Sequence, residues 1–340
     1  MENRIDLNKY QIRTDLIIEN NYLNDDNCDV KEVSDSIRVT SVVVDDSLSK
    51  SINKKNGDYV TIEFEDITNY EDREKLKEVL TDELKNVLDK INIGDDDNCL
   101  IVGLGNSSST ADSLGPKVIS LVLVTRHLFE LDTNVKDGIR NVAAISPGVM
   151  ATTGIETYDI IVSLVDKIKP SFLIVIDSLA SMSIDRINKT IQITDTGIHP
   201  GSGVGNNRHE LSYDTIGIPV IAIGVPTVVE SSTIVNDTID FLFKHLSYIK
   251  NNYQVNKLVF KHNKNYLDEI KDVDLSSEEK KEVSGILGEL DNSSKKQLIE
   301  EVLTNLDYNL IVTPKEIDFL IDNLSEVIGE AINHSLHKEI

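Results

Sequence analysis

The chain has 340 residues, of which 40% are hydrophobic, and this is enough for a large core in one domain or two smaller ones. Acidic residues outnumber basic ones by 58 to 34, and the formal net charge of −24 disfavours binding to nucleic acid backbones or anionic membranes. No apolar run approaches the roughly 20 residues that span a bilayer, and no secretion signal opens the sequence. Cys28 and Cys99 have no paired spacing, which fits a reducing compartment. We therefore expect a cytoplasmic protein.

The first thirty-odd residues are polar and acidic, and we expect an arm with little core content. Residues 36–44 and 59–64 are rich in β-branched side chains and flank a Lys/Asn/Gly turn, which predicts a β-hairpin. Between residues 76 and 91 apolar side chains recur at helical spacing, which indicates an amphipathic helix.

From residue 98 the pattern alternates between strand and helix, and this predicts an α/β fold with a mostly parallel central sheet and helices on both faces. The segment after Pro116 is apolar nearly all round, so we expect a deeply buried helix there. The predicted strands lie near 98–103, 141–145, 171–177, 190–195 and 218–225, and the predicted helices near 116–130, 155–168 and 232–246.

Beyond residue 250 the strand patterns stop, and we expect a helical C-terminal region over 251–340. Thr313-Pro314-Lys315-Glu316 has the pattern of a capping box, with Thr313 as the N-cap. The helix that follows should bury one apolar face, which consists of Ile317, Leu320, Leu324, Val327, Ile328 and Ala331.

Two acids stand where predicted strands end. Asp177 follows the apolar run 172–176 directly, and Asp112 lies between the strand ending at residue 103 and the helix predicted after Pro116. In open α/β sheets, ligands bind outside the carboxyl ends of the strands, so Asp177 is a candidate for function. Asp112 is either a helix-capping acid or a base held at a helix N-terminus.

The glycines of Gly103-Leu104-Gly105 allow a dinucleotide-binding turn or a tight turn that returns the chain to Asp112. Ser108 occupies the place of the third glycine of the dinucleotide pattern, which favours the plain turn.

Asp195-Thr196-Gly197 matches the tripeptide of pepsin-like proteases, but those sites need two such loops in an all-β fold. Asp195 remains a third candidate acid, and His199 a further auxiliary candidate. The glycine loop that follows could direct backbone N–H groups at an anion or a carbonyl, or be a plain surface loop. Its glycines are Gly201, Gly203 and Gly205.

Asp112, Asp177 and His199 could together hold a divalent metal. No HExxH sequence and no paired histidines support this alternative, in which the chain is a metal-dependent α/β hydrolase. A third alternative is a non-catalytic α/β binding module.

With these residues in view, the chain resembles the germination proteases of spore-forming bacteria. The resemblance covers residues 5–20 and about 98–245 and returns after Thr313, whereas residues 254–300 match poorly, as an insertion would. The matching segments are 102–106, 112–116, 124–128, 146–150, 153–157, 176–180 and the long run 190–229. Ala111 departs from the family pattern, which has proline before the aspartate.

The resemblance implies an endopeptidase of the spore core that digests small acid-soluble DNA-binding proteins, and a homotetramer. The two essential aspartates of the family correspond to Asp112 and Asp177, and the family's core is similar to that of hydrogenase maturation proteases. It is treated as an atypical aspartic peptidase, so we expect no metal and no cofactor.

The family is made as a zymogen that removes its own leader. Asp15-Leu16-Ile17-Ile18-Glu19 resembles the substrate cleavage sequence, with the cut after Asp15, and since the sequence starts at Met1 we expect the zymogen. The expected parts are a propeptide over 1–15, a catalytic domain over 16–250 and the C-terminal region over 251–340.

The expected mechanism has Asp112 and Asp177 share one proton across a bound water. The ionised acid takes a proton from the water and the protonated one donates to the scissile amide. The glycine loop would stabilise the oxyanion. A basic residue would pair with the acid beside the cut, and the candidates are Arg126, His127, Arg186 and Arg208.

Overall fold

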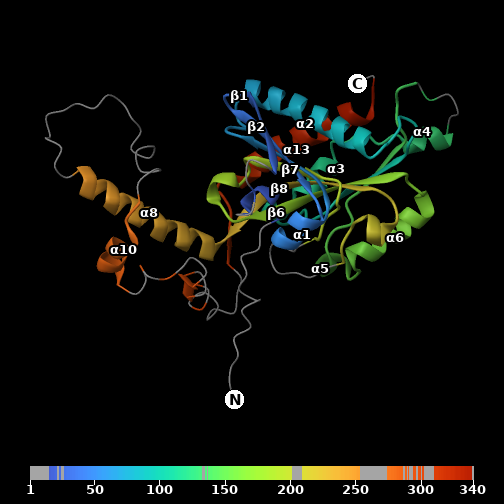
Figure 1. Ribbon diagram of the computed structural model, residues 1–340. Helices are drawn as coiled ribbons and strands as arrows, with labels where there is room; N and C mark the ends of the chain where they lie inside the picture. The colour runs from blue at the N-terminus through green and yellow to red at the C-terminus, as the bar shows by residue number, and fades with distance from the viewer. Residues whose placement is uncertain are drawn as a thin grey trace, which may run out of the picture. The chain divides into compact units, whose positions relative to one another are not determined.

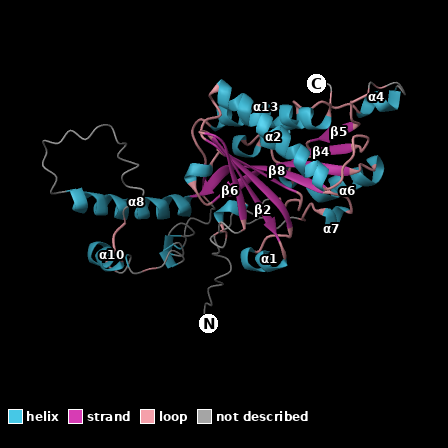
Figure 2. Cartoon of the chain, turned by 45° about the horizontal axis from the view of Figure 1, so that its top comes forward, coloured by secondary structure: helices cyan, strands magenta, loops and turns pink. Residues whose placement is uncertain are grey.

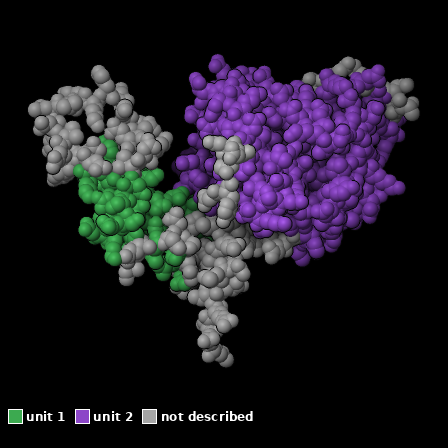
Figure 3. Space-filling view, viewed as in Figure 1, with its two compact units in different colours: residues 1–12, 230–312 green, residues 13–229, 313–340 purple. Residues whose placement is uncertain are grey.

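The computed structural model describes residues 15–20, 23, 27–131, 135, 137–200, 209–252, 274–285, 288, 290, 294–295, 298–299, 301 and 310–338. It divides into two compact units, one of residues 13–229 and 313–340 and the other of residues 1–12 and 230–312 (Figure 3). The sheet and the candidate acids belong to the first unit. The second contains α8 (Ser231–Asn252), α10 (Ser277–Ser284) and the short strand β9 (Ile311–Val312).

The sheet of the first unit is mixed, with three parallel and four antiparallel pairs among β1 to β8. Its strands lie in the order β1-β2-β3-β7-β8-β6-β4-β5 (Figures 1 and 2). β8, β6, β4 and β5 are parallel neighbours, and the remaining pairs are antiparallel. The bounds are β1 (Cys28–Ser34), β2 (Ile37–Val44), β3 (Gly57–Phe64), β4 (Cys99–Gly103), β5 (Val142–Ile145), β6 (Phe172–Ser181), β7 (Thr190–Thr194) and β8 (Val220–Glu230).

The α/β fold predicted from the sequence is confirmed. β2 and β3 pair antiparallel as the predicted hairpin requires, but α1 (Asp46–Ile52) connects them. The two strands are not a separate hairpin, because β3 also pairs with β7 of the main sheet. The N-terminal strands are therefore part of the same sheet as the acids.

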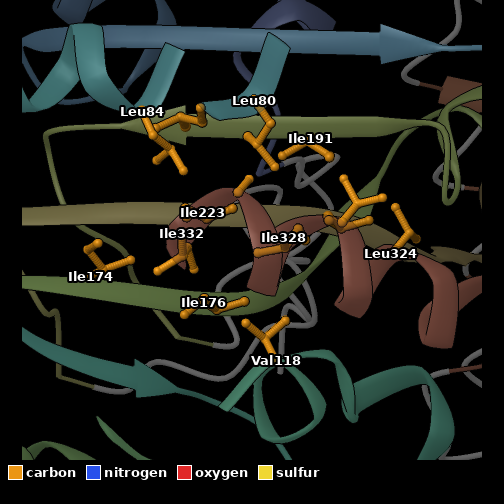
Figure 4. Packing of buried hydrophobic residues seen from close by; sticks show 14 of the residues in the cluster. Leu80, Leu84, Val118, Ile174, Ile176, Ile191, Ile223, Leu324, Ile328 and Ile332 are labelled. Carbon is orange, nitrogen blue, oxygen red and sulfur yellow. The ribbon is translucent and has the colours of Figure 1, made fainter. Parts of the chain in front are cut away.

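Two long helices cover one face of the sheet. α2 (Tyr70–Lys90) has Asn69 as its N-cap, and the Asn69 side chain accepts a hydrogen bond from the Glu71 amide at 2.9 Å. α13 (Ile317–Leu336) buries the apolar face expected from its sequence, and the two helices pack on each other and on the strands (Figures 1 and 4). Figure 4 shows members of this cluster, among them Leu80, Ile176, Ile191, Ile223, Leu324 and Ile328. α13 thus packs within the unit of the sheet, although it lies in the region 251–340 that the sequence set apart.

The capping box predicted at Thr313 is wrong. The Thr313 hydroxyl donates to the carbonyl of Thr227 in β8 at 2.9 Å, and α13 begins at Ile317 with Glu316 as N-cap. The hydroxyl therefore bonds a residue that is distant in sequence and does not cap the helix that follows it.

The helix predicted over 116–130 is two helices, α3 (Leu114–Ile119) and α4 (Arg126–Leu131). Asn333 of α13 explains the break, because its side chain accepts from the Leu123 amide at 2.7 Å and donates to the Leu121 carbonyl at 3.1 Å. The segment between the helices is not deeply buried as expected, since Leu121 is 46% exposed. Periodicity alone did not reveal these polar contacts.

The opposite face of the sheet has two separate apolar clusters. One packs α6 (Thr157–Ile168) against β4, β6 and β8, through Ile161. The other packs Ile17 against β2, β3 and α1, through Val42, Tyr59 and Ile52. The arm predicted to have little core content therefore contributes fully buried residues, Leu16 and Ile17. The described residues of this unit also form the short helices α5 (Met150–Thr153) and α7 (Tyr213–Ile216).

No helix among these residues is long and apolar enough to pass through a membrane.

Candidate active site

Asp177 lies within β6, directly after the buried apolar run Phe172–Ile176. Its side chain is 6% exposed, and Oδ1 accepts a hydrogen bond from the Ser178 amide at 2.9 Å. β6 continues past the end of its neighbour β4, which stops at Gly103, so the last residues of β6 form part of the carboxyl-end edge of the sheet.

Asp112 reaches the same edge through the loop after β4. The Leu104 amide donates to the Ile176 carbonyl at 2.8 Å, and the 3-10 helix η3 (Thr110–Asp112) packs against β6. The Thr227 hydroxyl of β8 also donates to the Ala111 carbonyl at 2.7 Å. The 3-10 helix that contains Asp112 therefore lies at the carboxyl ends of these strands, where it packs on β6, the strand that carries Asp177.

Gly105 makes this loop possible. Its φ is +113°, and a Cβ there would overlap the carbonyl oxygen of Asp112, which accepts from the Asn106 amide at 2.8 Å. The glycine turn thus serves the return of the chain to Asp112. α3 begins two residues after Asp112, with Ser113 between them as its N-cap, so Asp112 does not occupy the cap position.

The predicted processing segment lies on the end of β6. The Asp15 amide donates to the Ala180 carbonyl at 3.3 Å, and Asp15 Oδ2 accepts from the Ala180 amide at 3.0 Å. Leu16 and Ile17 have no exposed surface. The segment therefore contacts β6 three residues beyond Asp177.

Glu19 fixes the other end of this segment. Its carboxylate accepts from the Ser181 hydroxyl at 2.6 Å and from the Met182 amide at 2.9 Å, and it lies 3.6 Å from the guanidinium of Arg186. Arg186 also pairs with Glu63 at 2.7 Å. Of the basic residues singled out from the sequence that the structure describes, Arg186 is the one at this segment.

Asp177 and Gln192 belong to one row of residues across the sheet. Asp177 is in register with Gly224 of β8, Gly224 with Gln192 of β7, and Gln192 with Thr61 of β3. Residues in register point to the same face of a sheet, here the face opposite α2 and α13. With neighbouring strands about 4.8 Å apart, the Cα atoms of Asp177 and Gln192 are about 10 Å apart.

Asp195 and His199 lie at the other edge. β7 is antiparallel to β8, so its end at Thr194 is in register with Ala222, near the start of β8. Asp195 Oδ1 accepts from the Asp58 amide at 2.8 Å, and burial raises the pKa of this carboxyl. The structure therefore does not bring these two residues to Asp177, and Asp195 instead joins the start of β3 to the end of β7.

Arg126 and His127 also lie away from the acids. They open α4, and the preceding Thr125 bonds the Val142 carbonyl at the amino end of β5 at 3.0 Å. Arg126 pairs with Glu130 at 3.0 Å. The remaining predictions, Arg208 and the glycines Gly201, Gly203 and Gly205, lie outside the described residues.

Within the part of the chain that the structure describes, no group of three or more His, Cys, Asp or Glu side chains is arranged to hold a metal ion. His199 lies 3.1 Å from the carboxylate of Glu210.

Two residues that contact the predicted processing segment were missed from the sequence. Gln192 Nε2 donates to the Asp15 carbonyl at 3.1 Å, and Lys54 Nζ donates to the same oxygen at 3.0 Å. Burial lowers the pKa of Lys54, while the charges of Asp15 and Glu19 oppose this shift. An amide in the middle of a buried strand was a signal for Gln192, but Lys54 lies in a polar stretch without pattern.

A family model described as germination protease matches residues 10–340 of this chain, a range that includes residues 254–300. A germination protease from Priestia megaterium is 44% identical over 360 residues, which cover 100% of this chain and 97% of the relative. One from Bacillus licheniformis is 46% identical, with 99% and 96% covered. A solved structure of a [NiFe] hydrogenase maturation protease from Thermococcus kodakarensis aligns with 42% of this chain and 80% of its own, at 21% identity and a TM-score of 0.27.

Proposed function

This chain belongs to the germination protease family, and on that premise we propose that it is a self-processing endopeptidase that cuts after acidic residues. Its substrates are the small acid-soluble DNA-binding proteins of the spore core, and its zymogen releases residues 1–15 by a cut after Asp15. The observation that supports this most directly is the docking of Asp15–Glu19 on β6, the strand that carries Asp177.

Asp112 and Asp177 are the proposed acid pair. One carboxylate takes a proton from water, which attacks the carbonyl carbon of the acidic residue, and the other carboxyl protonates the departing amine. Both acids come from elements at the carboxyl ends of β4 and β6, and this placement supports a shared water. The mechanism makes both side chains necessary.

The contacts of residues 15–19 support a site that recognises acidic side chains, which we call the acid-reading site. The Ala180 amide contacts the Asp15 carboxylate, and Ser181, Met182 and Arg186 contact Glu19, so each carboxylate has its own partners. A negatively charged enzyme can accept an acidic cut site when the contacts are local and charge-assisted. Because residues 15–19 occupy these contacts, we propose that the zymogen is held inactive toward other proteins.

The test is cleavage of a purified small acid-soluble spore protein by the wild type, Asp112→Asn and Asp177→Asn, with new termini identified by mass spectrometry. We expect cuts after acidic residues by the wild type and a loss of at least about 1,000-fold in each variant. Asp159→Asn, an exposed acid on α6, is the matched control and should cut normally.

Three results would contradict the proposal. A full-length protein with its leader attached that digests substrate at the mature rate would rule out the zymogen. Loss of activity in a chelator, restored by a metal ion, would favour the metal-dependent hydrolase. Equal behaviour of the wild type and Asp177→Asn, with no cleavage by either, would favour a binding module.

A further inference from the structure

The carbonyl oxygen of Asp15 is held by two side-chain donors. Gln192 Nε2 lies 3.1 Å from it and Lys54 Nζ 3.0 Å from it. This oxygen belongs to the Asp15–Leu16 peptide bond, the bond that the proposed self-processing breaks. Separate contacts at Ala180 hold the Asp15 carboxylate, so these donors address the backbone rather than the acidic side chain.

Gln192 also fixes the chain beyond this bond. Its Oε1 accepts from the Ile17 amide at 2.6 Å, so one side-chain amide holds the peptide groups on both sides of Leu16. Both ends of the glutamine amide are used, and this determines that Nε2 faces the Asp15 oxygen. The side chain itself lies in the middle of β7 and is 6% exposed, which limits its movement.

The two residues that follow this carbonyl group are buried. Leu16 and Ile17 are fully buried, and Ile17 packs with Val42 and Tyr59. Hydrogen-bond donors that are fixed in advance in a site without water stabilise a developing negative charge more than donors in water do. Groups that stabilise an oxyanion lie 2.7–3.1 Å from the position that the oxyanion takes, and here both donors already contact the carbonyl oxygen from which it would form.

We propose that Gln192 and Lys54 form the oxyanion-binding site for the cut after Asp15, an inference that rests on the proposed self-processing. Water adds to the carbonyl carbon, and the electron pair of the C=O bond moves to the oxygen held by the two N–H donors. The tetrahedral intermediate collapses as the C–N bond breaks. The Leu16 nitrogen receives a proton from the carboxyl pair and leaves as an amine, and Asp15 ends in a carboxylate.

The row across the sheet supports this assignment. Gln192 and Asp177 point to the same face, and Gly224, the residue between them, has no side chain. The donors and one acid of the proposed pair are therefore on one side of the sheet. Lys54 reaches the oxygen from the connection between β2 and β3, so the two donors come from different parts of the chain.

The experiment measures the first-order rate at which the full-length protein yields a new Leu16 N-terminus, by mass spectrometry. Gln192→Glu keeps the acceptor for the Ile17 amide but replaces the Nε2 donor with an anionic oxygen. Lys54→Met removes the ammonium but keeps a chain of similar length. We expect each to lower the rate about 100-fold or more, and Lys54→Arg, which keeps a charged donor, to retain more activity than Lys54→Met.

Two matched controls are available. Lys55→Met removes the neighbouring lysine, which pairs with Glu210 and Asp214, and Thr194→Val changes a hydroxyl on the same strand and face as Gln192. Both should process within about three-fold of the wild type, because neither contacts the Asp15 carbonyl.

Hydrogen exchange separates catalysis from docking. In an Asp177→Asn background, where the cut should not occur, the protection of the Leu16 to Glu19 amides reports whether the segment stays bound. We expect Gln192→Glu and Lys54→Met to retain most of this protection. Unchanged rates would overturn the proposal, and so would rate losses that follow a matching loss of protection. A wild type that never yields the Leu16 terminus would instead refute self-processing itself.

Discussion

One face of the sheet lies under α2 and α13 and is lined by apolar side chains, whereas the other carries Asp177, Gln192 and Thr61 and lies under α6, α1 and residues 15–19. Two long helices bury continuous apolar stripes and supply much of the stability of the fold. A short peptide buries only a few side chains and is held largely through hydrogen bonds. One face of the sheet thus carries the larger apolar cluster, and the other holds residues 15–19.

The largest expected effect is on the helical face. Ile328→Ala removes a fully buried side chain between α13 and the strands and should lower the free energy of unfolding by about 3 kcal/mol. Urea unfolding followed by circular dichroism measures this change. Phe319→Ala on the same helix is the control, because Phe319 is 56% exposed, and it should change stability by less than about 1 kcal/mol. Equal effects of the two would show that this face does not determine stability.

A smaller effect should follow from adding a side chain at Gly224, which lies between Asp177 and Gln192 on the face that holds residues 15–19. A Cβ at Gly224 would overlap the side chain of Leu179, so Gly224→Ala should cost about 1–3 kcal/mol in stability and slow self-processing. Because the overlap is with the end of a side chain, Leu179→Ala added to Gly224→Ala should recover processing relative to the single variant. Normal processing and wild-type stability of Gly224→Ala would contradict this prediction, because they would show that the position accepts a side chain.

A still smaller change concerns the hold on Glu19. Arg186→Gln removes a guanidinium 3.6 Å from the Glu19 carboxylate but leaves the contacts from Ser181 and Met182. The arginine is partly exposed, so we expect a loss of about 1 kcal/mol or less, seen as hydrogen exchange a few times faster at residues 16–19. Arg38→Gln, which breaks the exposed pair with Glu32, should leave that exchange unchanged. Identical exchange in both variants would remove Arg186 from the acid-reading site.

The smallest effect is at the opposite edge, where burial raises the pKa of Asp195. A raised pKa in the folded state means that the protonated form contributes stability, which is lost as pH rises from the unfolded value through the folded one. Asp195→Asn keeps an acceptor for the Asp58 amide and removes the charge, so its stability relative to the wild type should increase as pH rises from about 4 to 7. Urea unfolding over this range checks the trend, and an opposite slope would contradict it.

Much of the fold could be predicted from the sequence where local pattern and tertiary packing agree. The apolar runs of β4 and β6 and the stripe of α13 specify their own burial, because nearly every residue of one face has the same character. The break after α3 and the start of α13 could not be predicted, since Asn333 and Thr227 supply hydrogen bonds that local sequence does not reveal. At these ends, partners distant in sequence decide where a helix stops.

The candidate site was predictable to a similar degree. Asp112 and Asp177 could be found because a carboxylate after an apolar run is conspicuous, and both lie on elements at one edge, although β6 continues past Asp177 to Ser181. Asp195 also follows an apolar strand, but β7 runs antiparallel to β8, so this strand ends at the opposite edge of the sheet. The sequence of residues 190–195 does not indicate the direction of the strand. Lys54 and Gln192 depend on the chain crossing back over the sheet, a contact between residues far apart in sequence that no local pattern encodes.

The unit that holds the sheet is assembled from two separated stretches of the chain, with residues 230–312 between them. Synthesis proceeds from the N-terminus, so every strand of this sheet from β1 to β8 leaves the ribosome before α13 does. Until residues 317–336 have been made, apolar side chains such as Ile176 and Ile223 lack the helix that covers them. A nascent chain therefore cannot complete this core before its last residues have been made.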